Sequence, residues 1–81
     1  MKVNVLAFAQ AREALGSGRI ELELPEGSLV SDALAAIERR AGAIAPLRPH
    51  LAIALDATLA KTDEPLRDGC ELALLPPVSG G

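Results

Sequence analysis

One segment of the chain carries the apolar spacing of a long amphipathic helix, and segments of alternating apolar residues precede and follow it. The spacing runs to Ala41 and Gly42 ends it, while Ser28 is placed to cap the first turn. The apolar positions are Val30, Ala33, Leu34, Ile37 and Ala41. A chain of 81 residues has no room for a second layer of helices. The sequence therefore predicts one sheet with a single main helix packed across one face.

Two strands are predicted before the helix. Lys2 to Ala9 is the first, because its side chains divide between two faces at a period of two. One face holds Val3, Val5 and Ala7, and the other holds Asn4, Leu6 and Phe8. Gln10 to Leu15 contains good helix formers and stops at Gly16, so it elaborates the connection to a second strand at Arg19 to Leu24. These segments form one hairpin.

Prolines and turn residues divide the chain after the helix. Pro46 and Pro49 predict a loop from Ala43 to His50, since proline lacks the amide donor and restricts the residue before it. Three strands are expected beyond this loop: Leu51 to Leu55, Thr58 to Ala60, and Cys70 to Leu75 after the turn Asp68-Gly69.

The predicted order of elements, ββαβ(β)β, belongs to the α+β class. It is the β-grasp arrangement of ubiquitin, with a mixed sheet of four to five strands and one main helix across one face. We place the β-grasp domain at residues 1–75 and a flexible C-terminal tail at residues 76–81.

Composition excludes several kinds of site. The chain has one cysteine, Cys70, and one histidine, His50, too few for an internal disulfide or for the ligands of a zinc site. The net charge is −3, and there is neither a basic cluster beyond Arg39 and Arg40 nor a row of aromatic residues. No apolar run approaches the roughly 18 residues of a membrane span, and the N-terminus reads as a strand rather than a signal peptide. We expect a cytoplasmic protein with no metal site and with neither nucleic acid nor membrane as a partner.

The chain carries no catalytic motif and ends on two glycines. Nucleophile elbow, phosphate loop, dinucleotide fingerprint and paired-carboxylate patterns are all missing from its sequence. Because glycine has no side chain, Gly80 and Gly81 can thread a narrow channel and present the terminal carboxylate inside another protein's active site. Pro76 and Pro77 stiffen the approach. We expect a protein that is not catalytic alone.

Three segments carry a resemblance to a known family. They are Phe8-Ala9-Gln10-Ala11-Arg12-Glu13, Asp68-Gly69-Cys70-Glu71-Leu72-Ala73 and Pro76-Pro77-Val78-Ser79-Gly80-Gly81. Together they resemble the small subunit of molybdopterin synthase, a sulfur carrier of the MoaD/ThiS ubiquitin-like superfamily, over essentially the whole chain. Two positions depart from the family's usual pattern: Cys70 replaces a polar acidic residue, and Leu29 replaces a threonine that often caps the helix.

The resemblance implies that the chain is a substrate of its partners. An adenylyltransferase resembling ubiquitin activators uses ATP to convert the Gly81 carboxylate to an acyl adenylate, and a persulfide sulfur donor then displaces AMP to leave a thiocarboxylate. The charged carrier docks in the large catalytic subunit of molybdopterin synthase. There it gives its sulfur to cyclic pyranopterin monophosphate in molybdenum cofactor biosynthesis. No cofactor is expected to bind the carrier tightly.

Strand parity predicts where these partners dock. If Val3, Val5, Ala7, Leu72 and Leu74 form the core, then Leu6, Phe8, Ala73 and Leu75 lie on the far face near the exit of the tail. An apolar outer face suggests a partner. The residues assigned to partner binding are Phe8, Leu75, Pro76, Pro77, Val78 and Ser79. Arg12, Lys61 and Arg67 are candidates for further partner contacts or for simple solvation, and Cys70 is assigned no role.

Two alternatives stay open. The chain could carry sulfur for thiamine biosynthesis or tRNA thiolation, where the diglycine is shared and partner identity discriminates. It could also be a ubiquitin-like modifier or adaptor, and lysine conjugates in cells would favour the modifier.

Overall fold

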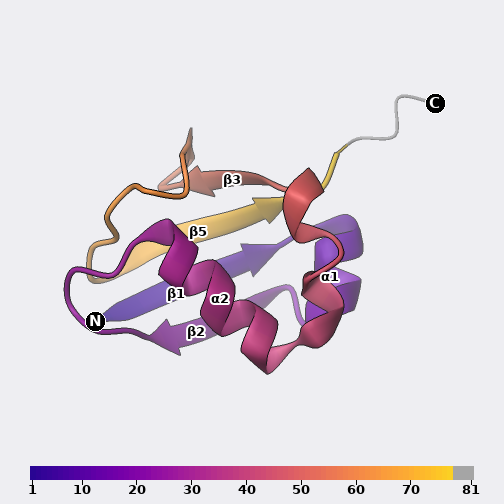
Figure 1. The fold of residues 1–81 in the computed structure, drawn as a ribbon, viewed down its shortest axis with the longest axis horizontal. Coiled ribbons are helices and arrows are strands. Elements are labelled where there is room, and N and C mark those ends of the chain that lie inside the picture. Colours follow the sequence, from indigo (N-terminus) through magenta and orange to yellow (C-terminus); the bar gives the residue numbers. More distant parts are fainter. Residues whose placement is uncertain (78–81) are drawn as a thin grey trace.

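A computed structural model describes residues 1–77 of the chain. Five strands form one sheet in the order β2-β1-β5-β3-β4. The elements, in chain order, are β1 (Lys2–Ala7), α1 (Ala9–Leu15), β2 (Arg19–Glu23), α2 (Val30–Arg40), the 3₁₀ helices η1 (Gly42–Ile44) and η2 (Arg48–His50), β3 (Ala52–Leu55), β4 (Thr58–Leu59) and β5 (Cys70–Leu75) (Figure 1). The described residues confirm the predicted mixed sheet and its main helix.

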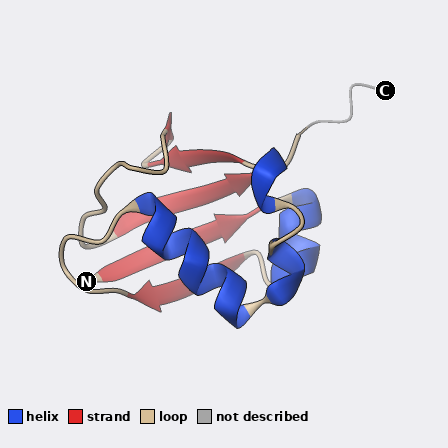
Figure 2. Ribbon diagram, viewed as in Figure 1, coloured by secondary structure: helices blue, strands red, loops and turns tan. Residues whose placement is uncertain are grey.

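The sheet places the last strand at its centre. β5 pairs with β1 in parallel and with β3 antiparallel, while β1 pairs antiparallel with β2. The main helix α2 crosses one face of the sheet, and α1 lies at the end where the arrowheads of β1 and β5 both point (Figure 2). This is the β-grasp arrangement, and its parallel central pair brings the ends of the first and last strands together.

Alternation along the strands decides which side chains are buried, as predicted. Val3, Val5 and Ala7 are buried on β1, and Cys70, Leu72 and Leu74 are buried on β5. The helix contributes its predicted apolar stripe, of which Val30, Ala33, Leu34 and Ile37 are buried. These residues belong to one contiguous hydrophobic cluster between the sheet and α2. The inner face of the sheet is therefore fully used for packing.

The first strand ends two residues earlier than predicted. β1 stops at Ala7, and Phe8 becomes the residue before α1. The backbone of Ala9 has φ of 49°, which turns the chain out of the sheet and starts the helix one residue before the predicted Gln10. A helix of seven residues therefore fills the connection that the helix formers predicted.

The prediction that Ser28 caps the main helix is wrong. The cap position belongs to Leu29, whose backbone N–H donates to the Asp32 carboxylate at 2.7 Å. The Ser28 hydroxyl donates instead to the Pro25 carbonyl at 2.8 Å. The first N–H groups of α2 donate to carbonyls of a distant segment, from Val30 to Glu64 at 2.9 Å and from Ser31 to Thr62 at 2.8 Å. A side-chain cap is unnecessary because backbone partners satisfy this helix end.

The segment from Ala43 to His50 is more ordered than the predicted loop. It holds η1 and η2, and Ile44 of η1 is buried in the core. Pro49 fits near the start of η2, where a missing N–H costs no helical hydrogen bond. An ion pair of 2.7 Å joins Arg48 to Glu38 of α2. Among residues 1–77, no helix combines the length and apolarity needed to cross a membrane.

Candidate docking face and chain exit

The chain leaves the sheet from the C-terminal end of β5. Because β1 runs parallel to β5, Phe8 lies beside this exit, and its N–H donates to the Leu74 carbonyl at 3.3 Å. On the other side, Ala52 at the start of β3 pairs with Leu75. Pro76 is half-buried and Pro77 is exposed. Two segments that are far apart in the sequence, at the end of β1 and the start of β3, therefore flank the point where the predicted tail begins.

A row of four apolar residues crosses the outer face of the sheet next to this exit. The register pairs Leu6 with Ala73, Ala73 with Ala54, and Ala54 with Leu59. Leu75 lies on the same face, two residues beyond Ala73. Ala54 is buried within this row, and we call the other residues, Leu6, Leu59, Ala73 and Leu75, the docking face. Leu59 is 72% exposed, and an apolar side chain of this size in water at a sheet edge is typical of a binding surface.

The next row of the same face is polar. Asn4 of β1 lies between Glu71 of β5 and Glu21 of β2. Lys2 and Glu23 are paired one row further from the exit. Apart from Arg19, which pairs with Leu6 at the β2 edge, the outer face is therefore divided, with apolar side chains near the exit of the chain and charged side chains far from it. A partner that buries the apolar half keeps the charged half at the rim of the interface, as in many protein interfaces.

The structure brings together four of the six residues predicted to bind partners. Phe8 is 47% exposed, and Leu75, Pro76 and Pro77 follow one another at the end of β5. Val78, Ser79, Gly80 and Gly81 lie outside the described residues. The predicted separation of Leu6, Phe8, Ala73 and Leu75 from the core is confirmed, since the structure leaves each of them exposed or half-buried.

Leu59 was missed by reasoning from the sequence. Its place opposite Ala54 depends on the tight turn at Asp56 and Ala57, which have φ of 49° and 69°. Two central residues with positive φ define the hairpin turn that links adjacent strands with the shortest connection. The Asp56 carboxylate also accepts a hydrogen bond from the Glu71 N–H at 2.9 Å, which holds the turn against β5. In the sequence, Asp56 at the turn was the signal from which the position of Leu59 could have been predicted.

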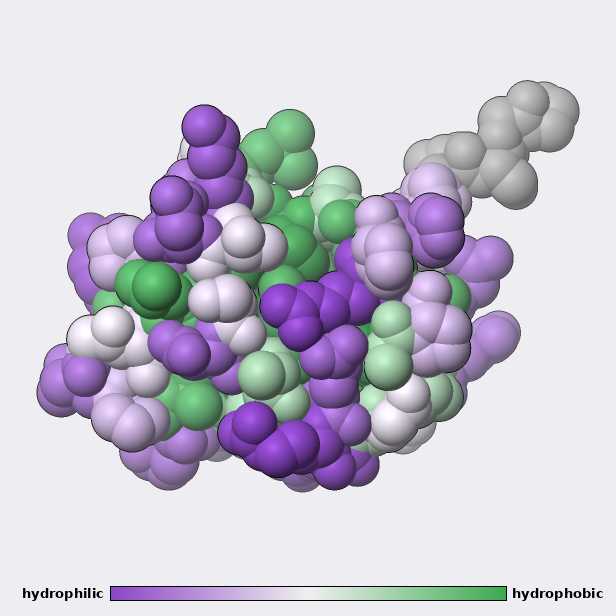
Figure 3. All heavy atoms as spheres, viewed as in Figure 1, coloured by the Kyte–Doolittle hydropathy of each residue, from purple (hydrophilic) through white to green (hydrophobic). Residues whose placement is uncertain are grey.

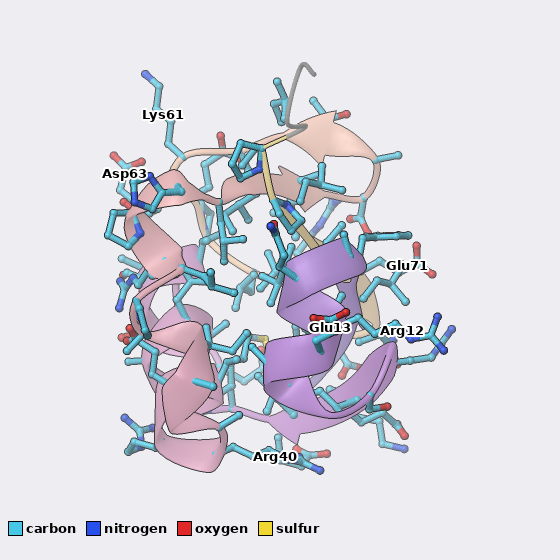
Figure 4. The ribbon with its side chains drawn as sticks, turned by 90° about the vertical axis from the view of Figure 1, so that its right-hand side faces the viewer. Arg12, Glu13, Arg40, Lys61, Asp63 and Glu71 are labelled. Carbon is cyan, nitrogen blue, oxygen red and sulfur yellow. The ribbon has the colours of Figure 1, made fainter. Side chains whose placement is uncertain are left out.

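Arg12 and Lys61 extend outward from different elements in Figure 4. Arg12 extends from α1 beside Glu13, on the side of the molecule where the chain leaves the sheet. Arg67 donates to Asp56 at 3.4 Å, and its side chain is 82% exposed. Cys70 is buried in the core as a small apolar side chain. These positions support no reaction by themselves.

Residues 1–77 contain no group of three or more His, Cys, Asp and Glu side chains able to hold a metal ion. The fold and this surface define a class: a β-grasp domain whose last strand leaves the sheet beside an apolar sheet face. The chain belongs to the ThiS family, whose family model matches residues 5–81.

Relatives match the chain over its length. It is 38% identical to the molybdopterin synthase sulfur carrier subunit of Escherichia coli (strain K12), over 98% of this chain and 99% of that protein. It is 35% identical to the protein of the same name from Chlamydomonas reinhardtii, over 100% of both chains.

Solved structures share the fold. SAMP1 from Haloferax volcanii has a TM-score of 0.91 at 28% identity, and the match covers 100% of both chains. A chain of the complex of subunits 1 and 2 of molybdopterin-converting factor from Helicobacter pylori has a TM-score of 0.71 at 28% identity, again over 100% of both chains.

Proposed function

We propose that this protein is the sulfur carrier subunit of a molybdopterin synthase. The observation that carries the proposal is the end-to-end match to relatives of that name, which at 38% identity leaves almost no part of either chain unmatched. The sequence ends in Gly80 and Gly81, the residues that such a carrier needs for its chemistry. The proposal assigns the reactive carbonyl to Gly81 and assigns passage through narrow active sites to Gly80.

The chemistry starts from an unreactive group. A free carboxylate is a poor electrophile, so an adenylyltransferase joins an oxygen of Gly81 to the AMP portion of ATP and releases pyrophosphate. The outer sulfur of the persulfide donor then attacks the carbonyl carbon, and AMP leaves with the shared oxygen to give an acyl disulfide. A thiol cleaves the S–S bond by forming a disulfide with the donor sulfur, and the terminal group is released as a thiocarboxylate. In the catalytic subunit, this sulfur is transferred to cyclic pyranopterin monophosphate. The carrier binds no cofactor tightly, because ATP is consumed by the activating enzyme.

The residues that the structure describes form the surface by which partners recognise the carrier in this cycle. The docking face and Phe8 lie beside the exit of the chain, so a partner that covers them receives the residues beyond Pro77 in a defined direction. The partners are the large catalytic subunit, the adenylyltransferase and the sulfur donor. The complex of two subunits in the Helicobacter pylori structure supports the first of these. The cytoplasm, where ATP is available, is the proposed location.

Intact mass tests the proposal. The full chain is incubated with its adenylyltransferase, ATP and a sulfur donor, and the expected product has one oxygen of Gly81 replaced by sulfur. Omission of ATP is the control, and it should leave the mass unchanged. If the enzyme forms adenylate with a known carrier but the mass of this chain never changes, the carrier function is wrong.

A second function is favoured by one observation. The similarity to SAMP1, a small archaeal modifier protein, at a TM-score of 0.91 fits a modifier, in which the activated Gly81 carbonyl is joined to lysines of other proteins. Cells that express a tagged chain distinguish the two functions. Ladders of tagged conjugates that require Gly81 would establish the modifier, whereas restored molybdopterin synthesis without conjugates would establish the carrier.

Phe8→Ala is expected to weaken binding to the catalytic subunit by about ten-fold or more. The reason is that aromatic side chains at the centre of an interface commonly contribute more than about 1 kcal/mol, and nearly half of Phe8 is exposed beside the chain exit. Titration calorimetry measures the Kd. Glu26→Ala, an exposed substitution in the turn between β2 and α2, is the control and should bind as the unaltered chain does. Equal Kd values for both variants would remove Phe8 from the interface.

A further inference from the structure

The two edges of the sheet differ in how far side chains cover their backbone groups. At the β2 edge, the Ser17 hydroxyl accepts from the Arg19 N–H at 3.2 Å and donates to the Arg19 carbonyl at 2.8 Å. Arg40 donates to the Glu21 carbonyl at 3.4 Å, and Glu23 adds a further charge. Side chains that hydrogen-bond to the backbone groups of an edge strand, and that carry charge there, prevent another strand from pairing with it. The β2 edge is therefore blunted.

The opposite edge is left open over part of β3. The edge strand β4 has only two residues and pairs with Ala54 and Leu55. One further bond, from the Ala60 N–H to the Ile53 carbonyl at 2.8 Å, shows that Ile53 directs its backbone groups away from β5. Beyond Ala60 the chain turns toward α2, where Thr62 accepts a hydrogen bond from Ser31. The Ile53 N–H has no hydrogen-bond partner within residues 1–77.

An open hollow lies beside this edge. It is lined by Leu51, Ala52, Ile53, Leu59, Ala60, Lys61, Thr62 and Asp63. Figure 3 shows hydrophobic side chains at the upper centre of the view with hydrophilic side chains on either side, and Figure 4 shows Lys61 and Asp63 on the side of the molecule that carries α2. The lining thus combines apolar side chains of β3 and β4 with one charge of each sign. Backbone groups and an apolar hollow together fit an extended polypeptide segment.

We propose that the catalytic partner subunit adds an extended segment as a strand along Leu51 to Ile53 and inserts an apolar side chain into the hollow. This inference rests on the proposed function and names the way in which the partner binds. A strand is the occupant because it can accept from the Ile53 N–H and donate to the Leu51 carbonyl, two groups that face the same side of β3.

The position of the edge places it within reach of a partner that binds the docking face. Ala52 pairs with Leu75, so the open part of β3 begins directly beside the chain exit. Leu59 belongs both to the docking face and to the lining of the hollow. A protein that holds the residues beyond Pro77 in its active site therefore meets this edge in the same encounter. The strand would extend the interface around the sheet and fix the orientation of the carrier.

Hydrogen exchange of backbone amides tests the proposal directly. NMR measures exchange in the full chain, alone and bound to its catalytic subunit, and the Ile53 amide is expected to exchange at least about ten-fold more slowly in the complex. The Glu21 amide on the blunted β2 edge is the matched control and should not change. A complex in which Ile53 exchanges as fast as in the free chain would overturn the strand, although the proposed function would stand. Failure to form any complex would instead contradict the proposed function.

Two matched substitutions test the hollow. Leu51 lines the hollow and Leu24 directly follows β2, and both are half-buried leucines packed against the core. Leu51→Glu and Leu24→Glu should cost similar stability, but only Leu51→Glu is expected to raise the Kd for the catalytic subunit, by about ten-fold. Leu51→Ala introduces no charge, so its Kd separates the effect of lost packing from the effect of the buried glutamate charge. Equal Kd values for the two glutamate variants would show that the hollow is not occupied.

Discussion

Deletion of Gly81 is expected to abolish sulfur loading while leaving the free energy of unfolding unchanged within about 0.5 kcal/mol. Loading fails because the terminal carboxylate moves back by one residue, about 3.5 Å along an extended chain, and no longer reaches the reacting groups of the adenylyltransferase. Stability is unchanged because the hydrophobic core lies between Val3 and Leu74. Intact mass measures loading, and urea denaturation measures stability.

Two controls make the deletion informative. One alanine appended after Gly81 keeps every native residue but moves the carboxylate outward, so loading should fail there as well. Glu26→Gln, an exposed change in the turn after β2, should load normally. Loading of the shortened chain at the normal rate would show that the reactive group lies elsewhere. A large loss of stability on deletion would show that the last residue contributes to the packed domain.

Leu72→Ala should destabilise the protein by about 2–5 kcal/mol. Leu72 is fully buried in the central strand, where it is paired with Val5 of β1 and Leu55 of β3. A chain of 81 residues is expected to have a total stability of roughly 4–12 kcal/mol. A single cavity at this position therefore removes a large share of it. Urea denaturation should show a lower midpoint, with an unfolded fraction in the absence of urea if the total lies at the low end.

Leu75→Ala is the matched variant, since it makes the same chemical change three residues later in the same strand. Leu75 is half-buried on the other face of the sheet, so its loss should cost less than about 1.5 kcal/mol of stability. It should instead weaken binding to the catalytic subunit, because Leu75 belongs to the docking face. Equal losses of stability in the two variants would contradict the division of β5 into a core face and a docking face.

The position of the recognition surface beside the chain exit follows from the parallel pairing of β1 with β5. The C-terminal ends of parallel neighbouring strands lie at the same end of a sheet, so the turn at Phe8 lies beside Pro76, which follows Leu75. Residues 1–77 hold no cluster of metal ligands, and the surface beside the chain exit is apolar. Such a surface suits recognition, and the reactive group that we propose is the chain terminus itself.

Local patterns were sufficient for much of the fold. The bounds of β5 agree with the prediction, and Cys70, Leu72 and Leu74 are buried as parity required. The main helix lies where its apolar spacing predicted it, within one residue at its C-terminal end. Periodicity reports these features because each side chain's direction depends only on its neighbours along the chain. The terminal glycines could likewise be read directly, and the carrier hypothesis depends on them.

Contacts between distant segments decided the rest. The cap of α2 was mispredicted because carbonyls of Thr62 and Glu64 satisfy its first N–H groups, and no local signal in the sequence reports a partner so far along the chain. Leu59 and the open edge at Ile53 depend on how two strands pair and where their pairing stops. Side-chain periodicity is local and can be read from the order of residues. Which backbone N–H and C=O groups of a sheet find hydrogen-bond partners is decided only when the whole chain has folded.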